Sequence, residues 1–221
     1  MPDPRQKKLA KHKKKRATAQ RGRSFGERNE AAEAVMRRIK RDGPGYEPGP
    51  CFIASSWKDQ SKSRVLPVAV TRRPAAGHLV MVIYLVDLGC FGLKDAVLTL
   101  PFEDARVGEL LQNLANVAQE PIEAVSLQDA STIVRRAVAW GKKHGFEPAA
   151  EDLELLSWLG PEEPSELEVV CGREGKVVYE PDPEEDTKPI VQKLVQAVGP
   201  DGFVVTLPRG KAPEAEAPDE G

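Results

Sequence analysis

The apolar positions near the start of the chain have the spacing of a helix. Four of them fall on one helical face between Ser24 and Gly43, which predicts a short amphipathic helix that ends at this glycine. They are Ala32, Val35, Met36 and Ile39. The segment GPGYEPGP, residues 43–50, then combines glycine with proline and predicts a hinge before the main fold.

Three apolar runs that are rich in β-branched residues follow the hinge and predict strands. They cover residues 51–57, 64–73 and 78–88. The last two are joined by PAAG, which predicts a hairpin turn. Pro67 cannot donate to a ladder, so we expect its strand to lie at a sheet edge or to begin just after the proline. The next segment, GLKDAVLTLPFED, predicts a short helix or turn and then an irregular stretch near Pro101.

The middle of the chain has the period of helices. Apolar residues in 104–121 follow the i, i+3, i+4, i+7 pattern, which Pro121 closes. A second stripe in residues 127–145 follows Ser126 and precedes a glycine suited to a C-cap. Residues 149–160 predict a third, shorter helix. The two apolar stripes consist of Val107, Leu110, Leu111, Leu114, Val117 and Ala118, and of Ala130, Ile133, Val134, Ala137 and Val138.

The C-terminal part alternates between the two periods. SELEVVCGRE and GKVVYE, residues 165–174 and 175–180, predict two strands around a hairpin-type turn. Residues 187–199 predict a helix, and GFVVTL predicts a last strand. Together these elements form a ββαβ unit. The fold class that we predict is α+β: antiparallel sheet elements, a central helical segment and this C-terminal unit, flanked by disordered tails.

Charge is distributed unevenly along the chain of 221 residues. The net charge is −2, yet residues 1–23 hold ten Lys and Arg against one acid. The remainder carries 22 bases and 33 acids, and fourteen of those acids lie in 147–186. A segment as charged and as poor in apolar residues as 1–23 cannot bury enough surface to order itself. We therefore divide the chain into four parts: a disordered basic tail (1–23), the helix and hinge (24–50), one α+β domain (51–207) and a disordered acidic tail (208–221).

Bulk properties exclude several classes of protein. No apolar run approaches the ~18 residues of a membrane-spanning helix, and the first 23 residues lack the apolar core of a secretory signal. Three cysteines without a CxxC pair argue against a disulfide framework and a zinc site, and they suit a reducing, cytoplasmic compartment. The usual motifs for nucleotide hydrolysis, dinucleotide binding, serine hydrolysis and zinc proteolysis are missing from the sequence. We expect no cofactor, no metal and no membrane partner.

The segment LVDLGCFGLKDA, residues 85–96, holds the residues best suited to catalysis. It places polar side chains on a glycine-rich turn after a strand, interpreted as a strand-to-helix corner. Asp87 would be a general base or a metal ligand, Cys90 a nucleophile and Lys94 an electrostatic stabiliser. The alternative is structural: glycines with positive φ, a core cysteine and an aspartate that caps the turn. We favour this alternative, because none of the three histidines completes a Cys/His signature.

Basic residues point to a polyanion. Cations strung along a phosphate backbone release counterions and bind with steep salt dependence. The tail has no interleaved aromatic residues, so we expect contact without sequence preference. A second basic patch falls on one face of the predicted helix 127–145. The residues expected to bind nucleic acid are Lys7, Lys8, Lys11, Lys13, Lys14, Lys15, Arg16, Arg21 and Arg23 in the tail, and Arg135, Arg136, Lys142 and Lys143 in the helix. Both basic segments have an alternative interpretation. The tail could pair with the acidic 147–186 region of the same chain, and the basic residues of the helix could form an ordinary solvated face.

Residues 85–96 also resemble the LVDxxCxGxKxA signature of a group of uncharacterised bacterial proteins that often begin with a Lys/Arg-rich tail. The helix ending in GFEP, the CGREGKVVYEPDP hairpin and the segment IVQKLVQAVGPDGFVV extend the resemblance over residues 51–206. The resemblance implies one folded unit in a bacterial cytosol and implies no activity. A histidine that the group tends to carry after the GFEP turn is replaced here by AAEDLEL.

Three functional hypotheses follow. The first is a cytoplasmic accessory protein whose basic arm binds RNA or a ribonucleoprotein while its body contacts another partner. The second is an enzyme that acts at the turn carrying Asp87, Cys90 and Lys94. The third is an interaction module whose acidic surface, including Glu162, Glu163 and Glu166, binds a basic partner.

Overall fold

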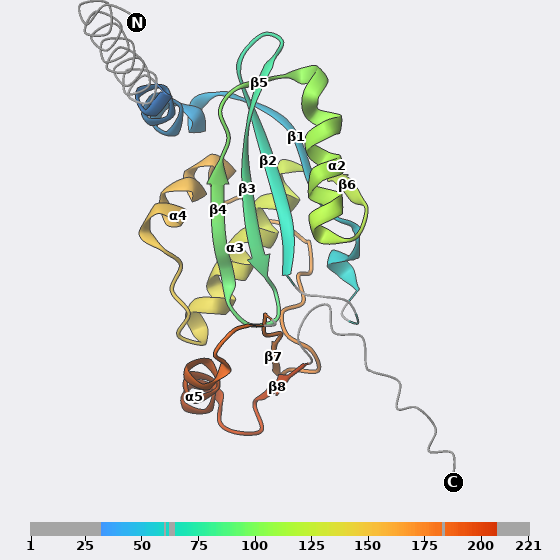
Figure 1. Cartoon of the computed structure of the whole chain (residues 1–221), viewed down its shortest axis with the longest axis vertical. Helices are drawn as coiled ribbons and strands as arrows, with labels where there is room; N and C mark the ends of the chain where they lie inside the picture. The colour runs from blue at the N-terminus through green and yellow to red at the C-terminus, as the bar shows by residue number, and fades with distance from the viewer. Residues whose placement is uncertain (1–31, 60, 62–64, 183, 207–221) are drawn as a thin grey trace, which may run out of the picture. The chain divides into compact units, whose positions relative to one another are not determined.

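The computed structural model describes residues 32–59, 61, 65–182 and 184–206 (Figure 1). The chain divides after Gly43 into two units. In the first unit, residues 32–42 form a helix, as predicted, with i,i+4 ion pairs such as Glu33–Arg37 at 3.6 Å. The predicted tails, 1–23 and 208–221, lie outside the described residues. The second unit, which begins at Pro44, contains the sheet and the remaining helices.

Antiparallel strands form the main sheet of the second unit, as predicted. Its strand order is β4-β3-β2-β1-β6, and β5 also pairs with β3. The turn between β2 and β3 is the predicted hairpin, with Ala75 opposite His78 and with Gly77 at φ +75°. The strands are β1 (Glu47–Ala54), β2 (Val65–Ala75), β3 (His78–Asp87), β4 (Gly92–Leu98), β5 (Phe102–Glu103) and β6 (Ile122–Val125).

Strand β1 begins inside the predicted hinge. A 3-10 helix covers Gly43–Gly45, and β1 starts at Glu47, so the hinge prediction is wrong for residues 47–50. The ladder to β2 shifts register between Pro48 and Cys51, and this irregularity accommodates the prolines. The Thr71 hydroxyl donates to the Pro50 carbonyl at 2.6 Å. A side chain therefore replaces part of the regular backbone pairing.

Strand β2 lies in the interior of the sheet, so the prediction that its strand lies at an edge or begins after Pro67 is wrong. It begins at Val65, before the proline, and is flanked by β1 and β3. Pro67 pairs with Leu85 of β3 and lies one residue beyond the last β1 partner, Val68. The proline thus lies at an end of the strand where only β3 is a paired neighbour, an edge-like environment that proline tolerates.

Residues 92–98 form strand β4 and not the predicted short helix or turn. The segment 85–96 is therefore a β-hairpin, and the interpretation as a strand-to-helix corner is wrong. Leu85 pairs with Asp95 while Val86 pairs with Leu93, so Lys94 is an extra residue on the β4 side. This bulge breaks the alternation of apolar and polar residues by which a strand is recognised.

Helices cover both faces of the sheet, in agreement with the predicted central helical segment (Figure 1). Helix α2 (Val107–Ala118) packs residues such as Leu110 and Leu114 against Met81 on one face. Helix α3 (Leu127–Lys143) contacts β1 to β4 and buries its apolar stripe, and Ser126 caps its first turn. Helix α4 (Ala150–Leu155) continues into a 3-10 helix (Leu156–Leu159). All three helices agree with the prediction.

The C-terminal part contains a smaller sheet of two parallel strands. These are β7 (Val177–Tyr179) and β8 (Phe203–Val205), which are connected through α5 (Thr187–Val198). The α+β class is thus confirmed, but the unit is βαβ, because residues 165–172 belong to no strand. Of the hairpin predicted for residues 165–180, the turn is present, with Arg173 bridged to Lys176. In the described part of the chain no helix is long and apolar enough to cross a membrane.

Candidate functional site

The carboxylate of Asp87 is committed to the backbone of the β3–β4 turn. One oxygen, Oδ1, accepts from the amides of Gly89 and Cys90 at 2.7 and 3.0 Å, and Oδ2 accepts from the Phe91 amide at 3.1 Å. The side chain is 3 % exposed. Burial raises the pKa of Asp87 more than the three amide bonds and Lys94 lower it. The geometry is that of a cap that organises a turn, which is the structural alternative.

The other two predicted catalytic residues face different surroundings. Cys90 is fully buried and packs with Val177, Tyr179 and Leu194. Burial raises the pKa of the Cys90 thiol, and the nearby Asp87 charge raises it further. Lys94 lies 3.8 Å from an Asp182 carboxylate oxygen and 5.0 Å from the centre of the Phe91 ring. A nucleophile needs a lowered pKa and an open path to its substrate, and Cys90 has neither here.

The same turn supports the C-terminal unit through its carbonyls. The Leu88 carbonyl accepts from the Gly172 amide at 2.7 Å. The Gly89 carbonyl accepts from the Val178 amide at 3.0 Å and from the Trp140 indole at 3.1 Å. Figure 1 shows β7, β8 and α5 at this end of the sheet. The turn therefore joins the main sheet, the end of α3 and the βαβ unit.

Two glycines permit the close approach of the turn to α3. Gly92 has φ +78°, and a β-carbon on it would collide with the Ala137 carbonyl. A β-carbon on Gly141 would collide with the Phe91 carbonyl. Together with the Asp87 cap and the buried Cys90, these contacts give the glycine at 92, the aspartate and the cysteine of the 85–96 segment a structural role.

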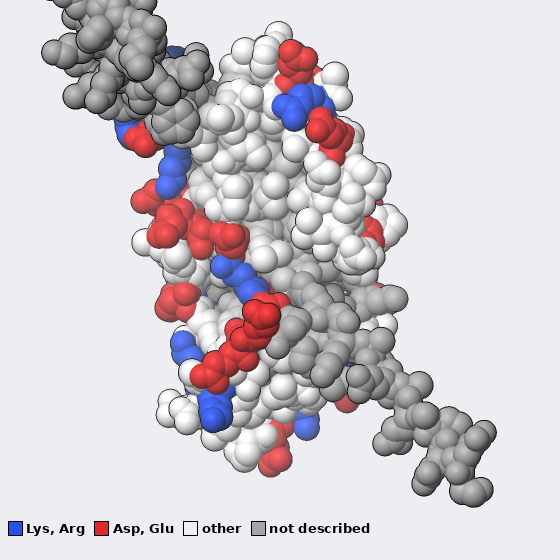
Figure 2. All heavy atoms as spheres, in the orientation of Figure 1, with Lys and Arg blue, Asp and Glu red and all other residues white. Residues whose placement is uncertain are grey.

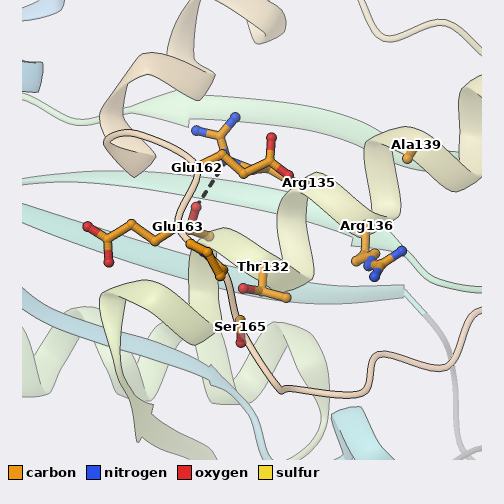
Figure 3. A pocket seen from close by; sticks show the side chains of 9 residues that line it. Thr132, Arg135, Arg136, Ala139, Glu162, Glu163 and Ser165 are labelled. Carbon is orange, nitrogen blue, oxygen red and sulfur yellow. Dashed lines mark hydrogen bonds between the residues drawn. The ribbon is translucent and has the colours of Figure 1, made fainter.

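The basic residues of α3 do not form one uniform surface. Arg135 donates to the Gly160 carbonyl at 2.6 Å and to the Ser131 hydroxyl at 3.1 Å. Arg136 is exposed, and Figure 3 shows the two arginines extending in different directions from α3. Near the C-terminus of the helix, Lys142 lies 3.4 Å from Glu147, and Lys143 lies 5.7 Å from the centre of the Trp140 ring.

Acidic residues share the cavity beside these arginines. This cavity of about 490 Å³ is lined by Arg135 and Arg136 and also by Glu162 and Glu163 (Figure 3). A phosphate backbone laid across it would meet carboxylates as well as guanidinium groups, which weakens its attraction. The nucleic-acid role of the α3 residues stays a prediction, and the local charges do not favour it. The nine basic tail residues named above lie outside the described part of the chain.

Arg72 is a functional candidate that was not predicted from the sequence. It is 4 % exposed, and its Nε and Nη2 donate to the Trp158 carbonyl at 3.1 and 2.6 Å, while Nη1 donates to the Tyr46 carbonyl at 3.1 Å. It lines a second cavity of about 320 Å³. Its position in β2 carried a signal, because alternation puts it on the same face as Val68 and Val70, which are buried. Desolvation lowers the pKa of Arg72.

The described residues provide no candidate metal site. No group of His, Cys, Asp and Glu that could hold a metal ion occurs among them. On the face seen in Figure 2, acidic and basic side chains intermingle along the left side and toward the centre, and the upper middle of the face carries neither. Comparison of the chain with family models, with curated proteins and with solved structures finds no match.

Proposed function

We propose that the chain binds nucleic acid, RNA or a ribonucleoprotein, through residues 1–23 and without sequence preference. The observation that carries the proposal is the density of charge in this segment, ten Lys and Arg against one acid, in a chain whose remainder is acidic. Such a segment can align its cations with successive phosphates and gains free energy from the counterions released. As an accessory protein of the cytoplasm, it would use its folded body for a second partner.

The charges of the body support an assignment to the tail. Several cations of the second unit are engaged by its own carboxylates, with Arg73 at 2.6 Å from Asp104 and Lys142 at 3.4 Å from Glu147. The two arginines of α3 have Glu162 and Glu163 as neighbours in their cavity. A polyanion therefore finds its most favourable partner in residues 1–23.

The test compares the full chain with a chain that lacks residues 1–23, using a labelled single-stranded RNA of about 20 nucleotides. We expect at least a hundredfold loss of affinity near 0.1 M salt on deletion, because most of the phosphate contacts disappear. A chain shortened by residues 208–221 is the matched control and should bind at least as well, because that segment is acidic. Equal affinity of the full chain and the chain without 1–23 would contradict the proposal.

A further inference from the structure

The Arg72 guanidinium is a buried cation without a buried anion. Its three hydrogen bonds go to main-chain carbonyls, and no Asp or Glu of the described residues forms an ion pair with it. Carbonyl dipoles satisfy N–H groups but do not neutralise a full charge. Arginine stays protonated under ordinary conditions, so the fold retains this charge. A complementary anion would relieve the cost of its desolvation.

The Arg72 guanidinium also has N–H groups that these three hydrogen bonds do not use. Of its five N–H groups, the described carbonyls use one on Nε, one on Nη1 and one on Nη2. One N–H on each terminal nitrogen therefore has no acceptor in the described part of the chain. A planar oxyanion with two oxygens can accept from both terminal nitrogens of an arginine.

The cavity beside Arg72 has the lining that an apolar organic acid requires. Its volume of about 320 Å³ lies at the lower end of the range for small-molecule sites. Apolar walls come from Leu127, Leu159 and Pro161, and the first turn of α3 adds the partial positive charge of a helix N-terminus. One guanidinium matches one negative charge. Glu163 also lines the cavity and is exposed, so it disfavours a dianion such as a phosphate monoester.

We infer that this cavity binds a small monocarboxylate with an apolar body, whose carboxylate is held by Arg72 and whose apolar part lies against Leu127 and Leu159. The inference does not depend on nucleic-acid binding by residues 1–23, because the cavity is built from the second unit alone. The competing interpretation is that Arg72 has only a structural role, in which it donates hydrogen bonds to the Trp158 and Tyr46 carbonyls.

Benzoate and its neutral counterpart benzyl alcohol are suitable probes. Titration of the full, isotope-labelled chain is followed by NMR at the Arg72 Nε–H group and at the Leu127 and Leu159 methyl groups. We expect saturable shifts with benzoate and at least tenfold weaker binding of benzyl alcohol, because the alcohol lacks the charge. Equal binding of the two probes, or shifts at neither Arg72 nor the leucines, would overturn the inference.

Three variants refine the test. Arg72→Gln should lose benzoate binding at least tenfold, and benzoate binding retained by this folded variant contradicts the assignment. Glu163→Gln removes a repulsive carboxylate at an exposed position and should tighten benzoate binding roughly threefold. Glu162→Gln is the matched control, since Glu162 lines the cavity beside Arg135 and Arg136 and does not line the cavity beside Arg72. If Arg72→Gln fails to fold, the Glu163/Glu162 comparison decides: equal effects of the two substitutions speak against the site.

Discussion

Asp87 acts on the backbone of its own turn, and this role has a consequence for stability against pH. Its folded-state pKa is raised by burial, so the folded chain binds a proton more readily than the unfolded chain. The contribution of Asp87 to the stability of the fold is therefore greatest below its unfolded pKa, and it is lost as the pH rises through the folded pKa. An ionised carboxylate in this position is held by three amides at the expense of its solvation.

Substitution of Asp87 by Asn tests this balance. The Asn variant has one acceptor oxygen and loses the bond from the Phe91 amide, which costs about 1–2 kcal/mol of unfolding free energy. It has no charge to desolvate, so its stability relative to the wild type should improve as the pH rises from 4 to 7. Denaturant unfolding of both proteins across this range measures the difference. Asp152, whose pKa is also raised by burial, is present in both proteins and cancels.

Asp201→Asn, at an exposed turn before β8, serves as the control for a change of net charge. A wild-type chain that gains stability over Asp87→Asn as the pH rises would show that the hydrogen bonds, and not burial, dominate at this site.

Cys90 distinguishes the structural interpretation from the enzymatic one. Its thiol is fully buried with a raised pKa, whereas Cys171 is partly exposed. We expect iodoacetamide to modify Cys171 first near pH 7.5 and to reach Cys90 only on unfolding, more than a hundredfold more slowly. Mass spectrometry of quenched samples gives the order. Alkylation of Cys90 faster than that of both Cys51 and Cys171 would revive the hypothesis of a catalytic turn.

At the scale of elements, the contact between the β3–β4 turn and α3 depends on the absence of a side chain at Gly141. Alanine normally stabilises a helix relative to glycine by about 1 kcal/mol. At Gly141 we expect the opposite, a loss of about 1–3 kcal/mol, because the added methyl group meets the Phe91 carbonyl. Gly108→Ala in α2 is the matched control, since nothing lies within 4 Å of a β-carbon there, and it should stabilise the fold. Chemical denaturation measures both, and stabilisation by both substitutions would contradict the packing described here.

Helices and strands whose apolar residues recur with a regular period were predictable from the sequence. Elements in which an extra residue or a proline interrupts that period were not. The stripe of α3 contains no irregular residue, so its position and its buried face were correct. In β4 the extra residue Lys94 shifts the side chains of one part of the strand to the other face, and the alternation disappears. The prolines at 48 and 50 argue against a strand, yet β1 begins at Glu47. Its ladder is irregular there, and the Thr71 hydroxyl donates to the Pro50 carbonyl.

The strand predicted over residues 165–174 does not form, for a different reason. Their apolar and β-branched composition suits a strand, but a strand also needs a neighbour, and no local pattern shows whether one exists. The amide of Gly172 pairs with the Leu88 carbonyl of a turn instead. The parallel pairing of β7 with β8 likewise depends on the crossover through α5.

The candidate sites were predictable only in part. The sequence drew attention to residues 85–96, but which backbone groups Asp87 contacts depends on the hairpin that forms. The role of Arg72 was not predictable for a related reason. The sequence shows that Arg72 alternates with valines, but the cavity beside it is lined by Leu159 and Pro161 from a distant part of the chain.

In the whole molecule, the two proposals concern two different kinds of anion. Residues 1–23 carry a dense positive charge that suits an extended polyanion. The body carries acidic and basic side chains intermingled on the face seen in Figure 2, and it places one buried guanidinium beside a small cavity. A long polyanion cannot use the second feature, and a small carboxylate gains little from the first.

Binding of RNA through residues 1–23 is tested by the salt dependence of RNA binding by the full chain and by the chain without these residues. Single-stranded binding loses about 0.7 in the logarithm of affinity per phosphate contact for each tenfold rise in salt. With most of the ten cations engaged, we predict a slope of roughly −5 for the full chain and a slope near zero for the shortened one. Identical steep slopes for the two proteins would place the phosphate contacts on the body and contradict the account.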